Sequence, residues 1–284
     1  MRLILIAMSF ATMSISLPAF SQSHEAMHNL LREGNTKLLE KELAKVQLKY
    51  DSGDITDFQL RNVYRQFYHL DGTDLKNLND WIKSKPNSYP AHLIRGVYYK
   101  KLGWNARGNK YINETKQWQI QSMNSYFSKA QQDLNKSMKL TDKPLLSIFH
   151  LLDICGAKGD ESCKSRLISI ADRDMPANVL LTCRYFHYLT PRWGGSYERM
   201  ATFIDKTDKQ LSDPIMHARL EAIMEDDMGG VSLSYGQREE AITHYKRALS
   251  LANNIGGSFR EDWLTFTKHA VRTMPELSKF REIK

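Results

Sequence analysis

Apolar side chains recur along most of the chain at the spacing of an amphipathic α-helix. In three stretches they fall three and four positions apart, which places them on one face of a helix. The stretches are Leu30, Leu31, Leu38, Leu39, Leu43 and Val46; then Leu60, Val63, Tyr64 and Phe67; then Leu75, Leu78, Trp81 and Ile82. No stretch alternates as a strand does, and 15 glycines and 8 prolines in 284 residues are too few for an all-β sandwich with many turns. The pattern predicts an all-α fold.

The segment YGQREEAITHYKRALSL, residues 235–251, resembles the second half of a tetratricopeptide repeat, a helix-turn-helix unit of about 34 residues. We expect Gly236 to form the turn, small residues to let the two helices approach closely, and Tyr245 to fill the space beside them. Asn253 stands where the repeat has a proline. The positions that carry the resemblance are Gly229, Gly236, Ala241, Tyr245, Ala248, Leu249 and Leu251.

Weaker copies of this unit are predicted upstream. In one of them Gly103 is the turn glycine and Ala130 lies in the second helix. The corresponding residues are five positions apart in segment 235–251 but 27 apart here, so about 22 residues are inserted between the paired helices. Another copy has its turn at Gly159 and its second helix around Ala171. The prediction is a tetratricopeptide-like solenoid with irregular repeats and an insert.

The first residues are predicted to be a signal peptide. Arg2 precedes a largely apolar run from Leu3 to Ala11, and Ala19-Phe20-Ser21 fits the small-x-small pattern of a cleavage site. The run is shorter than the roughly 20 residues that span a bilayer. The mature chain would then begin at Gln22 and be periplasmic or secreted, with no stable membrane insertion.

The predicted organisation follows from these boundaries. A signal peptide covers residues 1–21, N-terminal helices cover 22–86, and a degenerate helical-repeat domain covers 87–213. A tetratricopeptide-like repeat and a tail helix complete the chain over 214–284.

The stretch PRWGGS, residues 191–196, allows two interpretations. As a corner between helices, it has Gly195 at the turn position, its glycines supply unusual backbone angles and Ser196 caps the next helix. The apolar stripe of that helix would be Tyr197, Met200, Ala201 and Ile204. As a ligand loop, it would bind an anion at the helix N-terminus, although the lysine of a phosphate-binding loop does not follow.

Two motifs, WNARGNKY (104–111) and LTPRWGGSYERMATFID (189–205), resemble the bacterial domain-of-unknown-function 4034 family over about residues 75–210. The resemblance implies a helical fold. The family's name assigns no activity, so no catalytic residue is carried over. The matching residues are Trp104, Arg107 and Gly108 in the first motif, and Pro191, Arg192, Trp193, Gly194, Gly195 and Ser196 in the second.

The two motifs suggest a binding surface. Stacked repeats place equivalent turns along one edge, so Trp104 and Arg107 are expected on the same rim as Arg192 and Trp193. Tryptophan and arginine favour partner recognition through aromatic area and planar charge. The insert containing Trp118 would cover this rim. Alternatively, both tryptophans only fill gaps between imperfect repeats.

The three cysteines suggest one disulfide bond that links two helices. Cys155 ends a predicted helix and Cys163 begins its antiparallel partner, so the two could form a disulfide in an oxidising compartment. Cys183 would be left as a small buried residue of an apolar helix. The dispersed histidines and the lack of CxxC or HExxH predict no metal site.

The charged residues indicate neither nucleic-acid binding nor catalysis. The net charge of +8 becomes +7 without Arg2, and the lysines are interleaved with acids as on a solvated face, so no nucleic-acid partner is expected. His187, Glu225, Asp226 and Asp227 could serve acid–base catalysis, but no nucleophile motif accompanies them. We expect these acids on a solvated face, with Asp226 and Asp227 as candidates for holding basic groups of a partner.

The sequence thus predicts an exported helical-repeat protein that works by binding another protein or peptide, as solenoids do through extended concave surfaces. A specific version is an immunity-type protein that neutralises a toxin in the envelope. The alternative is an enzyme or a small-ligand binder with its site at the Trp104/Arg107 and Arg192/Trp193 rim. No cofactor and no catalytic residue are assigned, an enzyme is the less favoured class, and the oligomeric state is left open.

Overall fold

The structure, a computed structural model, describes residues 24–109, 114–176, 178–255 and 269–270. The predicted signal peptide and most of the predicted tail helix lie outside these residues. The described part is all-α, with twelve α-helices and no strand, so the predicted fold class is confirmed there. Within it, no helix has the length and apolar content needed to cross a membrane.

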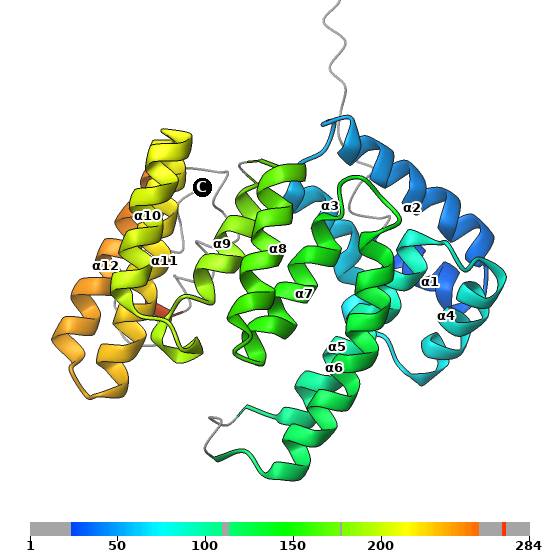
Figure 1. The fold of residues 1–284 in the computed structure, drawn as a ribbon, viewed down its shortest axis with the longest axis horizontal. Coiled ribbons are helices and arrows are strands. Elements are labelled where there is room, and N and C mark those ends of the chain that lie inside the picture. The colour runs from blue at the N-terminus through cyan, green and yellow to red at the C-terminus, as the bar shows by residue number, and fades with distance from the viewer. Residues whose placement is uncertain (1–23, 110–113, 177, 256–268, 271–284) are drawn as a thin grey trace, which may run out of the picture.

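The helices follow one another with short connections and pack mostly against their neighbours in sequence (Figure 1). The first are α1 (His24–Arg32), α2 (Thr36–Asp51), α3 (Asp57–Arg65), the 3-10 helix η1 (Gln66–His69) and α4 (Gly72–Ser84). Next come α5 (Tyr89–Arg107), α6 (Gln117–Met138), α7 (Leu145–Ala157) and α8 (Glu161–Asp174). The last are α9 (Val179–His187), the 3-10 helix η3 (Pro191–Trp193), α10 (Tyr197–Leu211), α11 (Pro214–Ser234) and α12 (Arg238–Ile255).

Short polar residues fix where several helices begin. Thr56 and Asp71 each form a capping box, in which the cap side chain and the third helical side chain bond each other's backbone N–H groups. Ser88, Asp160 and Ser196 accept a backbone N–H at the first turn of their helices. These caps satisfy N–H groups that have no partner inside a helix.

The apolar stripe from Leu30 to Val46 is divided between two helices, not one as its spacing suggests. Gly34 adopts a φ of +74° between α1 and α2, a left-handed conformation that ends a helix. Leu31 and Leu39 are still both fully buried, so the two helices cover the same core despite the break.

The insert predicted between Gly103 and Ala130 is mostly helix. It lengthens α5 and α6, and in Figure 1 this pair extends beyond the other helices. Gly103 is not the turn glycine: it lies inside α5, where a Cβ would be 2.4 Å from Phe127 Cδ1. The turn glycine is Gly108, with a φ of +73°. Gly103 allows α5 and α6 to pack closely. The spacing of glycines in the sequence does not distinguish a packing glycine from a turn glycine.

The helix pair α11–α12 matches its predicted contacts. A Cβ on Gly229 would lie 2.8 Å from Tyr245 Cε1, so only glycine lets the tyrosine ring sit against α11. Gly236 forms the turn with a φ of +76°. Ala241 and Ala248 are fully buried. The pattern in this segment therefore predicted its packing correctly.

One lysine corrects the expectation that the lysines lie on a solvated face. Lys164 is fully buried, and its ammonium group donates to the carbonyl of Tyr188 at 3.2 Å and contacts Glu161 Oε1 at 2.6 Å. Burial of a charge is tolerated because these oxygens replace water. Lys164 thereby ties α8 to the chain just after α9.

Candidate functional site

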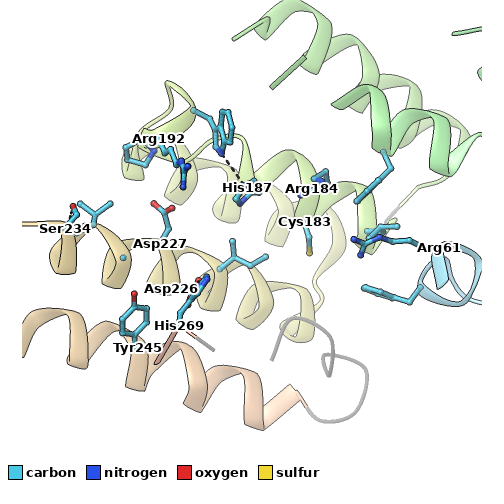
Figure 2. Close-up of a pocket in the computed structure, with 18 of the residues that line it drawn as sticks. Arg61, Cys183, Arg184, His187, Arg192, Asp226, Asp227, Ser234, Tyr245 and His269 are labelled. Atoms are coloured by element: carbon cyan, nitrogen blue, oxygen red, sulfur yellow. Dashed lines mark hydrogen bonds and ion pairs between the residues drawn. The ribbon is translucent and has the colours of Figure 1, made fainter. Parts of the chain in front are cut away.

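A cavity of about 830 Å³ lies between α9 and α11, with α3, α7 and α12 contributing to its walls (Figure 2). Its volume is in the range of about 300–1,000 Å³ that ligand sites commonly have. One wall is basic and the other is acidic. The charged and aromatic residues that line it are Arg61, Arg65, Arg184, Arg192, His187 and His269, then Asp226 and Asp227, and then Phe58, Phe149, Trp193, Tyr235 and Tyr245.

The PRWGGS stretch forms one end of the cavity as a tight corner. Gly194 has a φ of +83°, and a Cβ on Gly195 would lie 1.8 Å from the carbonyl oxygen of Leu189. The N–H groups of Gly194 and Gly195 donate to Pro191 and Thr190, at 3.0 and 3.1 Å. These two N–H groups are used within the turn, as expected for a corner between helices.

The next helix begins as expected. Ser196 accepts the backbone N–H of Arg199 and caps α10. Met200 and Ile204 are buried, whereas Ala201 is exposed, so the apolar stripe is narrower than its spacing predicts.

The two tryptophan motifs meet. The rings of Trp104 and Trp193 have centroids 6.1 Å apart in an edge-to-face arrangement, although 89 positions separate them in sequence. Arg107 lies over Trp104 with Cζ 5.7 Å from the ring, and Arg192 lies over Trp193 at 5.8 Å. Arg192 and Trp193 line the cavity, while Trp104 and Arg107 lie behind them in α5. Burial and the charge of Arg192 lower the pKa of Arg107.

Trp118 is placed differently from the other rim residues. It stands at the beginning of α6, its side chain is 59% exposed, and it is not among the described residues that line the cavity. Its role as part of a cover over the rim stays a prediction.

The expectation of a solvated acidic face is wrong for α11. Glu225 is buried and contacts His244 Nδ1 at 2.6 Å. The side chain of Asp226 is 12% exposed and contacts His269 Nδ1 at 2.7 Å. Asp227 accepts a hydrogen bond of 3.0 Å from the Tyr197 hydroxyl, and burial raises the pKa of this carboxyl. Helical spacing placed the acids correctly on α11 but did not reveal that a second wall faces them.

A buried ionic cluster behind the basic wall was not predicted. Asp153 is 3% exposed; Arg184 Nε lies 2.7 Å from its Oδ1, Lys100 Nζ contacts Oδ2, and the Tyr188 hydroxyl donates at 3.1 Å. Burial alone would raise the pKa of Asp153, but Arg184 and Lys100 hold it well below its usual range. The available signal was the presence of His150 and Asp153 in the otherwise apolar helix α7.

His150 joins this cluster as a neutral ring. Burial and the charge of Lys100 lower its pKa to about 3. Lys100 Nζ donates to Nδ1 at 2.8 Å, so the ring proton belongs on Nε2, which lies 3.2 Å from the Tyr68 hydroxyl. His150 thereby connects α5 and η1 through α7.

His187 orients the tryptophan of the corner. The Trp193 indole N–H donates to His187 Nε2 at 3.2 Å, which requires a neutral ring protonated on Nδ1. Burial, together with the charge of Arg184, lowers the pKa of His187 to about 4, in agreement with this hydrogen bond. In this geometry the ring acts as an acceptor that positions Trp193.

We expect the contribution of His187 to stability to fall as the pH is lowered from 7 to 5. The folded protein keeps the ring neutral, whereas the unfolded chain protonates it near its ordinary pKa of about 6.5. The unfolded state then binds more protons, so the free energy of unfolding decreases by about 2 kcal/mol over this interval. In urea denaturation at both pH values, the difference in this free energy between wild type and His187→Gln should shrink by that amount; a constant difference contradicts the prediction.

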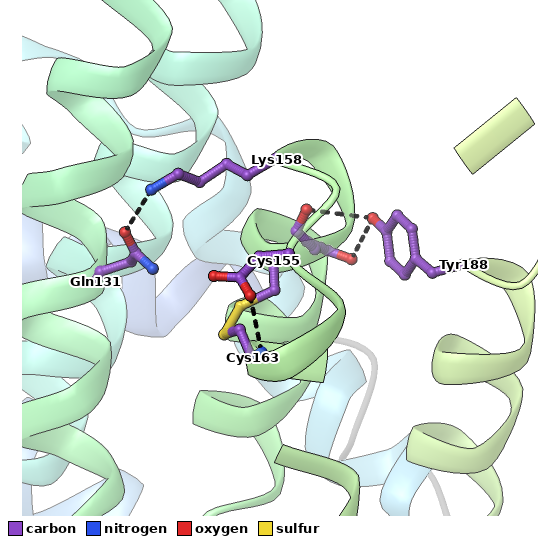
Figure 3. The surroundings of a disulfide bond; sticks show 7 residues. Gln131, Cys155, Lys158, Cys163 and Tyr188 are labelled. Carbon is purple, nitrogen blue, oxygen red and sulfur yellow. Dashed lines mark hydrogen bonds between the residues drawn. A yellow bond between two sulfur atoms is a disulfide. The ribbon is translucent and has the colours of Figure 1, made fainter. Parts of the chain in front are cut away.

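The predicted cysteine pair forms a disulfide in the structure (Figure 3). The Cα atoms of Cys155 and Cys163 are 5.9 Å apart, across the turn between α7 and α8. Asp160 accepts the backbone N–H of Cys163 at 2.9 Å, which fixes the beginning of α8 beside the bond. Cys183 is half-buried and lines the cavity, so the expectation of a fully buried residue is wrong.

We expect reduction of this disulfide to lower the free energy of unfolding by about 2–3 kcal/mol, as the loop-closure relation gives for a separation of eight residues. Denaturation of the purified protein with and without reductant measures the loss. Cys183→Ser should keep the sensitivity to reductant, and the double variant Cys155→Ser/Cys163→Ser should lose it. Three thiols per molecule, counted by mass spectrometry on protein purified from an oxidising compartment, would overturn the prediction.

The site defines the class of the protein as an all-helical protein with a partly enclosed cavity between oppositely charged walls. Among the residues that the structure describes, no group of three histidine, cysteine or acidic side chains could hold a metal ion. No family model, curated protein or solved structure matches the chain. The resemblance to the domain-of-unknown-function 4034 family stays a prediction.

Proposed function

We propose that the chain is an exported tetratricopeptide-like solenoid that binds a segment of another protein in the bacterial envelope. The observation that carries the proposal is the cavity, where four arginines on α3, α9 and η3 face two aspartates on α11. Oppositely charged walls favour a ligand that carries both signs of charge along its length. A segment of polypeptide has this character, and the aromatic side chains offer it apolar contact.

The corner residues are the natural anchors of such a segment. Trp193 is held by His187 and Trp104, so its ring needs little further ordering when a partner binds. Arg192 is exposed at the cavity and stacks on the same ring. Because Arg107 is only 9% exposed, we expect it to support the tryptophans more than to contact a partner directly.

Crosslinking in intact cells, followed by purification of the mature protein and mass spectrometry, tests this function. We expect one abundant protein partner, with recovery reduced about tenfold or more in Arg192→Ala and in Asp227→Asn. Arg166→Ala is the matched control, because Arg166 is exposed on α8 and is not among the described lining residues. Background-level recovery with the wild type, or equal recovery with all variants, would contradict the proposal. If the partner is itself toxic to cells, the immunity-type version is supported.

An enzyme is the second candidate, and one observation favours it. Asp227, whose pKa is raised by burial, and the neutral ring of His187 line the same cavity. A carboxyl group and an imidazole with shifted pKa values are common in acid–base catalysis. Turnover of a hydrolase or transferase substrate by the purified protein, abolished in Asp227→Asn but retained in Arg166→Ala, would favour this candidate.

A further inference from the structure

We infer that Arg61 and Arg184 form an anion subsite in the cavity, which takes an acidic side chain of the bound segment. This inference rests on the proposed function and names the chemistry of its ligand. It is carried by the geometry of two arginines around one phenylalanine ring and by the buried carboxylate that holds one of them.

Both arginines pack against Phe149. Arg184 Cζ lies 4.5 Å from the centroid of its ring and Arg61 Cζ lies 4.8 Å from it. The three residues come from α9, α3 and α7, and all three line the cavity. Figure 2 shows the two arginines at its wall. Contact with an aromatic ring restricts a guanidinium group, and here one ring restricts both groups.

Arg184 is also fixed from behind. Its Nε forms the 2.7 Å ion pair with Asp153, a carboxylate that Tyr188 and Lys100 hold in turn. The side chain is 28% exposed, so it is ordered by the buried cluster and still reaches the cavity surface. Because its rotamer is set before binding, less conformational entropy is lost when an anion binds.

The rest of the cavity selects among anions. Guanidinium groups pair well with carboxylates, often through two parallel hydrogen bonds. Asp226 and Asp227 on the opposite wall would repel a ligand with negative charge along its whole length. A segment with acidic side chains at one end and a basic side chain at the other satisfies both walls, and an apolar residue between them can contact the aromatic side chains.

Isothermal titration of the mature protein with defined peptides tests the subsite. The probes are Glu-Glu-Phe-Lys and Gln-Gln-Phe-Lys, both acetylated and amidated so that no terminal charge contributes, and inorganic phosphate. We expect the glutamate peptide to bind about tenfold or more tightly than the glutamine peptide, and its affinity to fall as salt is added.

Variants locate the effect. Arg61→Gln and Arg184→Gln should each remove most of the preference for glutamate, whereas Arg166→Gln should leave it unchanged. Arg65 is exposed and lines the cavity one turn after Arg61. Arg65→Gln should reduce the preference for the glutamate peptide, and it replaces the other two variants as the test if they do not fold. Equal affinity for the two peptides, or a preference that survives these substitutions, overturns the subsite. Binding of phosphate without a preference for glutamate overturns the assignment to carboxylates.

The subsite and the proposed function fail separately. A cellular partner whose capture depends on Arg192 and Asp227, with no glutamate preference in the titration, refutes the subsite and retains the binding function. A glutamate preference that depends on Arg184, with no partner captured from cells, supports the subsite and refutes the function as a protein binder.

Discussion

Replacement of Asp153 by asparagine should lower the free energy of unfolding by about 3–5 kcal/mol, the usual cost of removing one partner from a buried ion pair. Asparagine has the same size, so the change isolates the charge. The carboxylate is 3% exposed and bonded by Arg184, Lys100 and Tyr188. Its neutral replacement would leave Lys100 and Arg184, with side chains 12% and 28% exposed, beside an amide that cannot balance their charge.

The measurement is chemical denaturation at pH 7, with Asp80→Asn as the matched control. The side chain of Asp80 is 63% exposed and pairs with Lys76 one turn away, so we expect a change of at most about 0.5 kcal/mol. A loss below about 1 kcal/mol in Asp153→Asn would show that the buried cluster contributes no net electrostatic stabilisation.

A double-mutant cycle identifies the source of the loss. Lys100→Met should destabilise the protein because it leaves Asp153 with one cation fewer. In the double variant Lys100→Met/Asp153→Asn the loss should be smaller than the sum of the two single losses, since the pair is removed together. Strict additivity would mean that the two groups act independently, against their contact in the structure.

Hydrophobic periodicity predicted the part of the fold that local spacing determines. It predicted the all-α class. It also predicted the packing of Tyr245 against Gly229, because paired helices must approach closely. Spacing alone did not separate two uses of glycine. Gly103 packs inside α5 and Gly108 makes the turn, because the deciding factor is the Phe127 ring on another helix.

The candidate site was predicted in part, through the two motifs and through His187, Asp226 and Asp227. The two tryptophan motifs drew attention to residues that do lie in contact, Trp104 and Trp193. The cavity itself joins Arg61 to residues more than 120 positions later, and no local pattern encodes which helices face each other. The aspartates of α11 therefore looked like solvated residues until α9 was seen opposite them.

One chain of contacts connects the disulfide hairpin to the cavity. The ring of Tyr188 lies directly on Gly156, where a Cβ would be 2.1 Å from Cδ1, next to Cys155. The same tyrosine donates to Asp153, which holds Arg184 at the cavity wall. These contacts link the α7–α8 hairpin to the guanidinium group that we assign to ligand binding.

The second large effect is expected at the PRWGGS corner, where two adjacent glycines should differ in their tolerance of alanine. Gly195→Ala should lower the free energy of unfolding by about 3 kcal/mol or more, because its methyl group would overlap backbone atoms of Leu189. Backbone cannot move aside as a flexible side chain can. Gly194→Ala meets no atom within 4 Å, and its cost is only the left-handed φ of +83°, about 1–2 kcal/mol.

Denaturation followed by tryptophan fluorescence measures both effects. If the corner positions Trp193 against Trp104 and His187, Gly195→Ala should also change the emission of the folded state, whereas Gly194→Ala should change it little. Equal losses in the two variants would show that the tight approach to Leu189 does not determine the corner. The order predicted here, with the larger loss at Gly195, is the reverse of what backbone angles alone give, because only Gly194 has a positive φ.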